Sequence, residues 1–233
     1  MKDSARRRDH RFYIGVTLFL IATVVVGFWQ SYFGTLLTGG IARPMVMHLH
    51  GAVFTGWMVL LLVQVGLAAS GRVGMHRRVG NFGIWYGVLV WMMGVVATFA
   101  APVLHVSAGE WTLDQAAGFL IFPIGDMILF AGFFGAAVAY RNKPDMHKRW
   151  MLAATVALAF AAVARLNLPL HWFALLWLSP MFASMTYELI ARGRVHKVDA
   201  GATVIMAIAF PRIFLERSES WIAVGRVLLQ PFL

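Results

Sequence analysis

Long apolar runs separated by short polar segments recur along almost the whole chain. About 20 apolar residues in an α-helix are needed to cross a hydrocarbon core roughly 30 Å thick. The runs lack the strict alternation of membrane β-barrel strands, so the pattern predicts helices. We expect an all-α transmembrane helix bundle of about seven spans, at residues 12–34, 47–70, 81–104, 115–140, 149–166, 170–191 and 200–216.

The two ends of the chain differ from this pattern. Residues 1–11 are basic, and the apolar run that follows is too long for the core of a signal peptide and has no small-residue cleavage site. We therefore expect a basic N-terminal segment at 1–11 and a transmembrane bundle over 12–216. Residues 217–233 are too short to cross alone and are expected to form a short C-terminal helix lying at the interface.

The composition supports a membrane protein. The chain is 60% hydrophobic and 13% charged, whereas soluble domains carry about 45–50% and about 25%. Cysteine is absent from the sequence, which excludes disulfides, thiolate metal sites, iron–sulfur clusters and cysteine nucleophiles.

The cations divide unequally between the two predicted sides. The N-terminus and the loops after the second, fourth and sixth spans hold fifteen of the 20 Lys and Arg residues, and the opposite side holds only Arg43, Arg165, Arg212, Arg217 and Arg226. Cytoplasmic loops are enriched in Lys and Arg, so this bias predicts a cytoplasmic N-terminus in a bacterial inner membrane. The net charge of +10 then indicates anionic lipid headgroups as partners rather than nucleic acid. Assembly into a homo-oligomer or a larger membrane complex stays open.

A histidine followed by cations occurs in two matching segments. The sequence reads "MHRR" at 75–78 and "MHKR" at 146–149, with a weaker echo at His196. The match indicates a weak helical-hairpin repeat, and His76 and His147 could pair across it, although basic loops containing a histidine would give the same pattern. The cations are expected to contact headgroups. The residues are His76, Arg77, Arg78, His147, Lys148 and Arg149.

Polar residues within the predicted spans are the stronger functional signal, because they are expensive at membrane depth. His50, Trp57 and Gln64 are spaced seven residues apart, on one face of a helix. Asp126 lies near the middle of the fourth span and is expected to be protonated or paired, with Arg165 or a Trp N–H as its partner. Near the outer side the pattern gathers Arg165 with His48, His50, His105 and His171.

Several chemistries fit these residues. Haem b would need two imidazoles, His50 with His105 or His171. A Zn or Cu site could use His48 and His50 with those two histidines. A lipid-soluble quinone could occupy a pocket shaped by Trp57 and Gln64. The alternatives are a proton-coupled small-molecule transporter that uses Asp126 and Arg165, or a non-catalytic accessory subunit of a membrane complex.

The motifs "HLHGAVFTGWMVLLLVQ", "GRVGMHRRVG" and "DMHKRWMLAATVALAFAAVARL" resemble those of an uncharacterised family of bacterial multi-spanning inner-membrane proteins, known as a domain of unknown function. The resemblance covers roughly residues 45–175 and implies a topology and a set of site residues, and it leaves the reaction open. A more distant likeness is to ferric-reductase-like and b-type cytochrome membrane domains. The polar signature implied by the family falls on His50, Trp57, Gln64, His76, Arg77, Gly80, His147, Lys148, Arg149 and Arg165.

Overall fold

The computed structural model describes the backbone of residues 2–39 and 43–233, and the side chains of residues 7–39 and 43–233. Met1 and the side chains of Lys2 and Arg6, which belong to the predicted basic segment 1–11, lie outside the described residues. Every regular element in the described part is helical, as expected. The α-helices are α1 (Lys2–Gly27), α2 (Gly34–Leu37), α3 (Met45–Ala69), α4 (Val73–Ser107), α5 (Leu113–Phe119), α6 (Ile121–Ala139), α7 (Pro144–Ala164), α8 (Leu170–Arg192), α9 (Lys197–Ala209) and α10 (Glu219–Leu229). Three shorter helical turns are η1 (Trp29–Phe33, a π-helix), η2 (Phe210–Phe214) and η3 (Gln230–Phe232).

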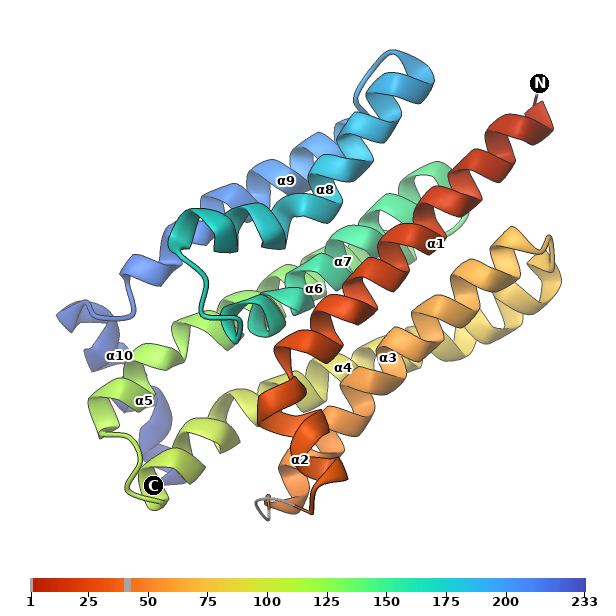
Figure 1. Ribbon diagram of the computed structural model, residues 1–233. Coiled ribbons are helices and arrows are strands. Elements are labelled where there is room, and N and C mark those ends of the chain that lie inside the picture. The colour runs from red at the N-terminus through yellow and green to blue at the C-terminus, as the bar shows by residue number, and fades with distance from the viewer. Residues whose placement is uncertain (1, 40–42) are drawn as a thin grey trace.

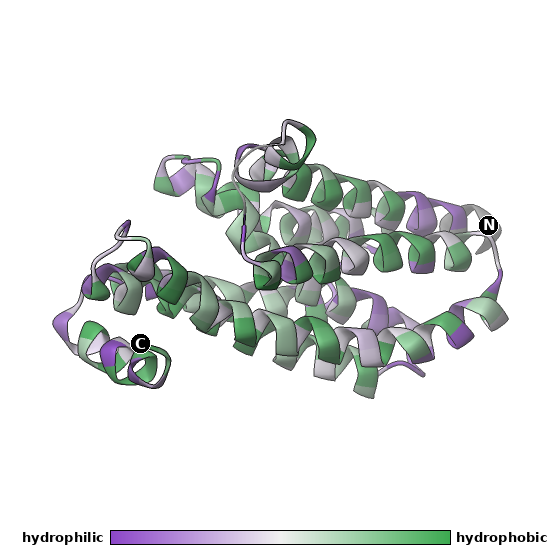
Figure 2. Ribbon diagram, turned by 90° about the horizontal axis from the view of Figure 1, so that it is seen from below, coloured by the Kyte–Doolittle hydropathy of each residue, from purple (hydrophilic) through white to green (hydrophobic). Residues whose placement is uncertain are grey.

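Several of these helices are long and apolar enough to cross a membrane. Within the described residues five stretches qualify, and a sixth is present if the pair Lys197–Phe214 and Glu219–Phe232, bent by 92°, forms one span. Figure 2 shows apolar residues along the middle of the long helices and hydrophilic residues concentrated toward their ends. The coarse expectation of a multi-pass helical membrane protein is therefore confirmed. The five stretches are Arg7–Gly27, Met45–Ala69, Val73–Ser107, Leu113–Ala139 and Leu170–Arg192.

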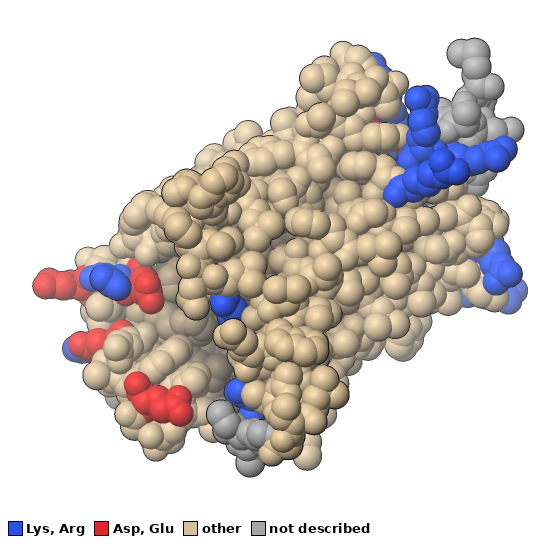
Figure 3. Space-filling model, viewed as in Figure 1, with Lys and Arg blue, Asp and Glu red and all other residues tan. Residues whose placement is uncertain are grey.

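The long helices run roughly alongside one another, so the connections gather at two ends (Figure 1). The start of α1 and the α3–α4, α6–α7 and α8–α9 turns lie at one end, which we call the basic end. The α1–α3 connection, α5, the α7–α8 loop and α10 lie at the opposite end, which we call the acidic end. Figure 3 shows the largest groups of Lys and Arg at the first end, and the visible Asp and Glu around α5 and α10 at the second, where a few Arg also lie. The loops grouped together from the charge pattern thus share one end of the bundle.

Helix α7 lies at the centre of this arrangement. It contacts α1, α6, α8 and α9, and eleven of its residues are buried. Small alanines on α7 allow close approach, while Phe160 packs edge-on against Trp177 of α8 with ring centroids 5.1 Å apart. The Trp177 indole N–H donates to the Val156 carbonyl at 2.8 Å. A buried indole with a satisfied donor contributes apolar area without the cost of an unpaired N–H.

Glycines close two of the three turns at the basic end, α3–α4 and α8–α9. Gly71 has a φ of 74° and Gly193 a φ of 69°, a left-handed conformation that glycine adopts without steric cost. Because these turns are short, the polar residues that follow are already helical. The "MHRR" and "MHKR" segments, which the sequence pattern placed in loops, therefore form the first turns of α4 and α7, ahead of the predicted span starts at 81 and 149.

The C-terminal helix α10 does not run alongside the long helices of the bundle (Figure 1). Helix α10 continues the chain at 92° to the α9–η2 segment and packs on α5. A Cβ on Gly225 would lie 2.4 Å from the Ala117 carbonyl oxygen, so the two helices cross nearly backbone to backbone. The predicted interfacial segment at 217–233 corresponds to this perpendicular helix.

The crossing of α1 and α7 generates a stability prediction. A Cβ on Gly27 would lie 2.2 Å from the Ala162 carbonyl oxygen, a backbone atom that cannot move aside alone. We expect Gly27→Ala to destabilise the protein by about 1–3 kcal/mol through overpacking. The measurement is the thermal midpoint of the detergent-purified protein.

Gly15→Ala is the matched control, because no described atom would lie within 4 Å of the added Cβ. There the same substitution in the same helix is expected to be neutral, or stabilising by up to about 1 kcal/mol through helix propensity. Equal effects of the two changes would contradict the proposed crossing.

Candidate functional site

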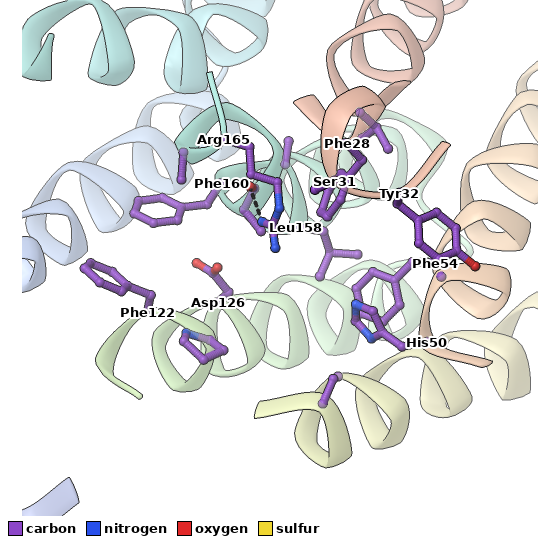
Figure 4. Close-up of a pocket in the computed structure, with 18 of the residues that line it drawn as sticks. Phe28, Ser31, Tyr32, His50, Phe54, Phe122, Asp126, Leu158, Phe160 and Arg165 are labelled. Carbon is purple, nitrogen blue, oxygen red and sulfur yellow. Dashed lines mark hydrogen bonds between the residues drawn. The ribbon is translucent and has the colours of Figure 1, made fainter. Parts of the chain in front are cut away.

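A cavity of about 570 Å³ opens between α1, α3, α4, α6 and α7, toward the acidic end of the bundle. This volume lies within the range of about 300–1,000 Å³ typical of small-molecule sites. Its walls are mainly apolar and include Phe54, Phe122, Leu158 and Phe160, as Figure 4 shows. The π-helical turn η1 contributes Ser31 and Tyr32 to the lining. Such turns occur frequently at functional sites.

A few polar side chains enter this apolar space. Figure 4 shows His50 reaching in from α3 and Arg165 from α7 on the opposite side. The Arg165 guanidinium donates to the Ala161 carbonyl of its own helix at 2.7 Å and lies 4.2 Å from the centre of the Phe28 ring. The Nδ1 atom of His50 is buried and has no hydrogen-bond partner among the described residues. Arg43, just before α3, also lines the cavity.

Asp126 also lines the cavity, from α6, and is 5% exposed. It forms an ion pair with Arg212 of η2, which is 8% exposed. The expectation that Asp126 is paired is therefore confirmed. The prediction that Arg165 is its partner was wrong, because no ion pair joins Asp126 to Arg165 among the described residues. Arg212 reaches Asp126 across Gly125, where a Cβ would lie 2.8 Å from the arginine side chain.

The other outer histidines do not join His50. His105 lies in the last turn of α4, where its Nδ1 pairs with Glu110 and its ring stacks on Trp111 at 4.2 Å. His171 is exposed at the start of α8, beside Trp172. His48 lies 3.4 Å from the Tyr32 hydroxyl. It cannot share a ligand with His50, because α3 is helical from Met45 and the two side chains point in different directions.

The positions of the histidines determine which cofactors the cavity residues could bind. The only histidine among the described residues that line the cavity is His50, so the pair of imidazoles expected for haem b is not brought together. Within residues 2–39 and 43–233, no three His, Asp or Glu side chains lie close enough to hold a metal ion. The donor set therefore fits neither a bis-histidine haem nor the Zn or Cu site considered from the sequence.

The predicted polar face of α3 divides between two places. Trp57 is 2% exposed and lines the cavity, with its ring edge-on to those of Phe130 and Phe134. Gln64 lies away from the cavity; in the amide orientation that satisfies both of its ends, its oxygen accepts from the Gly80 N–H at 2.7 Å. The regular spacing correctly placed all three residues on an interior face, but Gln64 is too far along the helix to share the site of His50.

The two matching histidines have the same structural position. His76 Nδ1 lies 3.2 Å from the backbone carbonyl oxygen of Gln64, and His147 Nδ1 lies 2.8 Å from that of Ala137. Each ring thus links the start of one helix to the end of the preceding helix. Among the described residues no hydrogen bond joins the two rings, so the structure supports two separate hairpin links in place of one shared clasp.

The cations of these two motifs differ sharply. Arg77 and Arg78 are exposed, as expected for residues near headgroups, whereas Arg149 is fully buried at 0% exposure. The Arg149 guanidinium pairs with Glu188 of α8, and with Asp199 of α9 at 3.0 Å. The expectation that Arg149 contacts lipid headgroups was therefore wrong. Sequence reasoning did not pair Arg149 with Glu188 or Asp199, although an acid near the basic end of a span needs a cation to balance it when it is buried.

A more exposed ring of charges surrounds Arg149. Lys148 pairs with Asp9 of α1 at 2.9 Å, and Arg192 of α8 pairs with Asp145 at 3.1 Å. Asp145 lies in the first turn of α7, ahead of the predicted span. Burial raises the pKa of Asp145, but hydrogen bonding and charge from Arg149, Lys148 and Arg192 outweigh that effect and lower it. A lowered carboxyl pKa stabilises the fold above the ordinary aspartate range, and this stabilisation is lost as the pH falls below it.

Comparisons with protein-family models, with curated proteins and with solved structures gave no match to the chain. The resemblance of the three sequence motifs to an uncharacterised membrane family therefore stays a prediction.

The ion pairs of Arg149 generate the second prediction. Arg149→Met would leave Glu188 and Asp199 buried without their cation, and we expect a loss of about 3–5 kcal/mol. Arg78→Met changes the residue at the matching position of the other motif, which is exposed, and is expected to alter stability by less than about 0.5 kcal/mol. Thermal midpoint and monodispersity in detergent report both. Equal behaviour of the two variants would contradict the buried network.

The pair formed by Asp126 and Arg212 generates the third. Each single change, Asp126→Leu or Arg212→Met, leaves one buried charge unpaired and is expected to cost about 3–5 kcal/mol. The double variant replaces both charges with apolar groups and should be more stable than either single variant. Additive losses in this double-mutant cycle would show that the two side chains do not interact.

Proposed function

We propose that the chain is a multi-pass inner-membrane protein whose interior cavity binds a small molecule that is soluble in the bilayer. The proposed topology has about seven spans and a cytoplasmic N-terminus. It is supported by the gathering of Lys and Arg at the basic end, where the start of α1 and three of the turns lie (Figures 1 and 3).

The observation that carries the binding proposal is a cavity with apolar walls and unpartnered polar groups. His50 Nδ1 and the Trp57 indole N–H are both buried without a hydrogen-bond partner in the described part of the chain. Buried polar atoms are nearly always satisfied in folded proteins, so such atoms around one space point to a ligand or ordered water that completes them. Apolar walls with a few convergent polar groups are typical of ligand sites.

Among the cofactors expected from the sequence, a lipid-soluble quinone fits this set better than haem b. A quinone needs apolar walls and hydrogen-bond donors for its carbonyl oxygens, and His50 and Arg165 can provide such donors. The single cavity imidazole argues against a bis-histidine haem.

The two alternatives are less well supported by the geometry. A carrier that titrates Asp126 would use the same cavity, but the ion pair with Arg212 already holds that carboxylate. In an accessory subunit without a ligand, unpartnered polar groups at membrane depth would lower the stability of the fold with no compensating contact. Ligand binding is therefore the function that the site supports best.

The test is ligand-dependent stabilisation of the detergent-purified protein. Three probes with different head groups are compared: decanoate (an acid), decanol (an alcohol) and decylubiquinone (a quinone). A ligand at a hundredfold excess over its Kd stabilises a protein by about 2.7 kcal/mol. We expect at least one probe to raise the thermal midpoint, and Ala97→Phe, which fills the cavity from α4, to abolish the rise.

Val96→Phe is the control, because Val96 is the neighbouring residue, is 47% exposed and lies outside the cavity lining. It should respond to the probe like the unmodified protein. The absence of a shift with all three probes, or a shift that Ala97→Phe leaves unchanged, would refute binding in this cavity.

A further inference from the structure

The charged side chains that line the cavity do not balance. Arg43 and Arg165 both line it, and no ion pair involves either of them among the described residues. Among the described residues, Asp126 is the only carboxylate in the lining, and it is paired with Arg212. Residues 40–42, which precede Arg43, are Gly, Ile and Ala and carry no charge. Two guanidinium groups therefore face one apolar space without a counter-anion from the described residues.

The contacts available to these two arginines satisfy only part of their hydrogen-bonding capacity. A guanidinium has five N–H donors. Among the described residues, Arg165 contacts one backbone carbonyl, at Ala161, and the face of Phe28, and the residue is exposed. The Nε of Arg43 is buried and finds no partner in the described residues. The Ser31 hydroxyl and His50 Nδ1, which also line the cavity, are likewise buried and unpartnered. The guanidinium groups and the Ser31 hydroxyl can donate a hydrogen bond, and His50 Nδ1 donates in the tautomer that carries its proton there.

The cations without an ion pair among the described residues lie at one end of the cavity, and the deeper lining is mainly apolar apart from groups such as Trp57 and the paired Asp126. Arg43 precedes α3, His50 lies in the second turn of α3, and Arg165 ends α7, so these groups lie at the rim near the acidic end. The lining continues toward the middle of the bundle through Leu20, Met58 and Met127. From His50 to Met58 the axis of α3 rises about 12 Å, which is the length of a medium alkyl chain. Figure 4 shows Arg165 and His50 facing this space from opposite sides.

We propose that the ligand is a single-chain amphiphile with an anionic head group, a carboxylate or a phosphate monoester. Arg43, Arg165 and His50 hold the head group at the rim, and the alkyl chain lies along the apolar walls toward Met58 and Met127. Arginine is well suited to this role, because its planar donors match the oxygens of carboxylates and phosphates. This inference rests on the proposed binding function and narrows it, since it favours an acid over a neutral quinone.

The experiment compares head groups on one chain length. Decanoate and decyl phosphate carry the anion, decanol carries the same chain without it, and acetate and inorganic phosphate carry the anion without the chain. Binding to the full-length protein is measured by titration calorimetry in a nonionic detergent. We expect decanoate or decyl phosphate to bind at least about tenfold more tightly than decanol, and acetate and inorganic phosphate not to compete.

Arg165→Gln should weaken the anionic amphiphile by about tenfold to a hundredfold and change the binding of decanol by less than about twofold. Arg165→Lys, which keeps the charge but loses the planar donors, should recover part of that loss. Arg43→Gln provides an independent variant, and a ligand-free thermal midpoint like that of the unmodified protein confirms that each variant folds.

The outcomes separate this inference from the broader proposal. Equal affinity for decanol and decanoate, or decanoate binding that neither arginine variant weakens, would overturn the anionic head group while leaving ligand binding intact. Competition by acetate or inorganic phosphate as strong as that of the amphiphiles would overturn the role of the chain. Loss of binding for every probe would overturn the proposed function itself.

Discussion

The buried guanidinium of Arg149 is the interaction on which the arrangement of the bundle depends most. A charge without solvent must be matched by opposite charges at hydrogen-bonding distance, and Arg149 finds these on α8 and α9 as well as within its own helix. Lys148, its neighbour, extends the network to α1. These ion pairs therefore constrain the position of α7 relative to α1, α8 and α9 more tightly than apolar packing alone would. The cavity lies along the same helix, toward its other end.

The two ends of α7 differ in how their charged side chains are paired. At the basic end, the buried Arg149 guanidinium is paired with Glu188 and Asp199. At the acidic end, the contacts of Arg165 among the described residues are a backbone carbonyl and an aromatic face, and the residue is exposed. Between them, Asp126 pairs with Arg212. Arg43 and Arg165 are therefore the charged residues of the cavity lining for which the described residues provide no ion pair.

The sequence predicts more of the fold than of the site. Long apolar runs determine where helices lie, and charge asymmetry correctly groups the loops that share an end, because both signals are local. Pairing across the bundle is not local. Asp126 was expected to need a partner, but the sequence has several candidate arginines, and only the packing of η2 beside Gly125 selects Arg212. Likewise Arg78 and Arg149 occupy matching positions in the two motifs. Arg78 is exposed, whereas Arg149 is buried where α7 packs against α8 and α9, which carry Glu188 and Asp199.

The composition of α7 has a consequence for how the protein enters the membrane. Within the described residues, α7 is a long helix that does not qualify as a span by its own apolar character. Its buried cation, Arg149, is paired with carboxylates on α8 and α9, which follow α7 in the chain. The hairpin link from His147 to α6 connects α7 to a strongly apolar predecessor from the start. We therefore expect the integration of α7 into the bilayer to depend on the helices that follow it, because α8 and α9 carry the carboxylates that pair with Arg149.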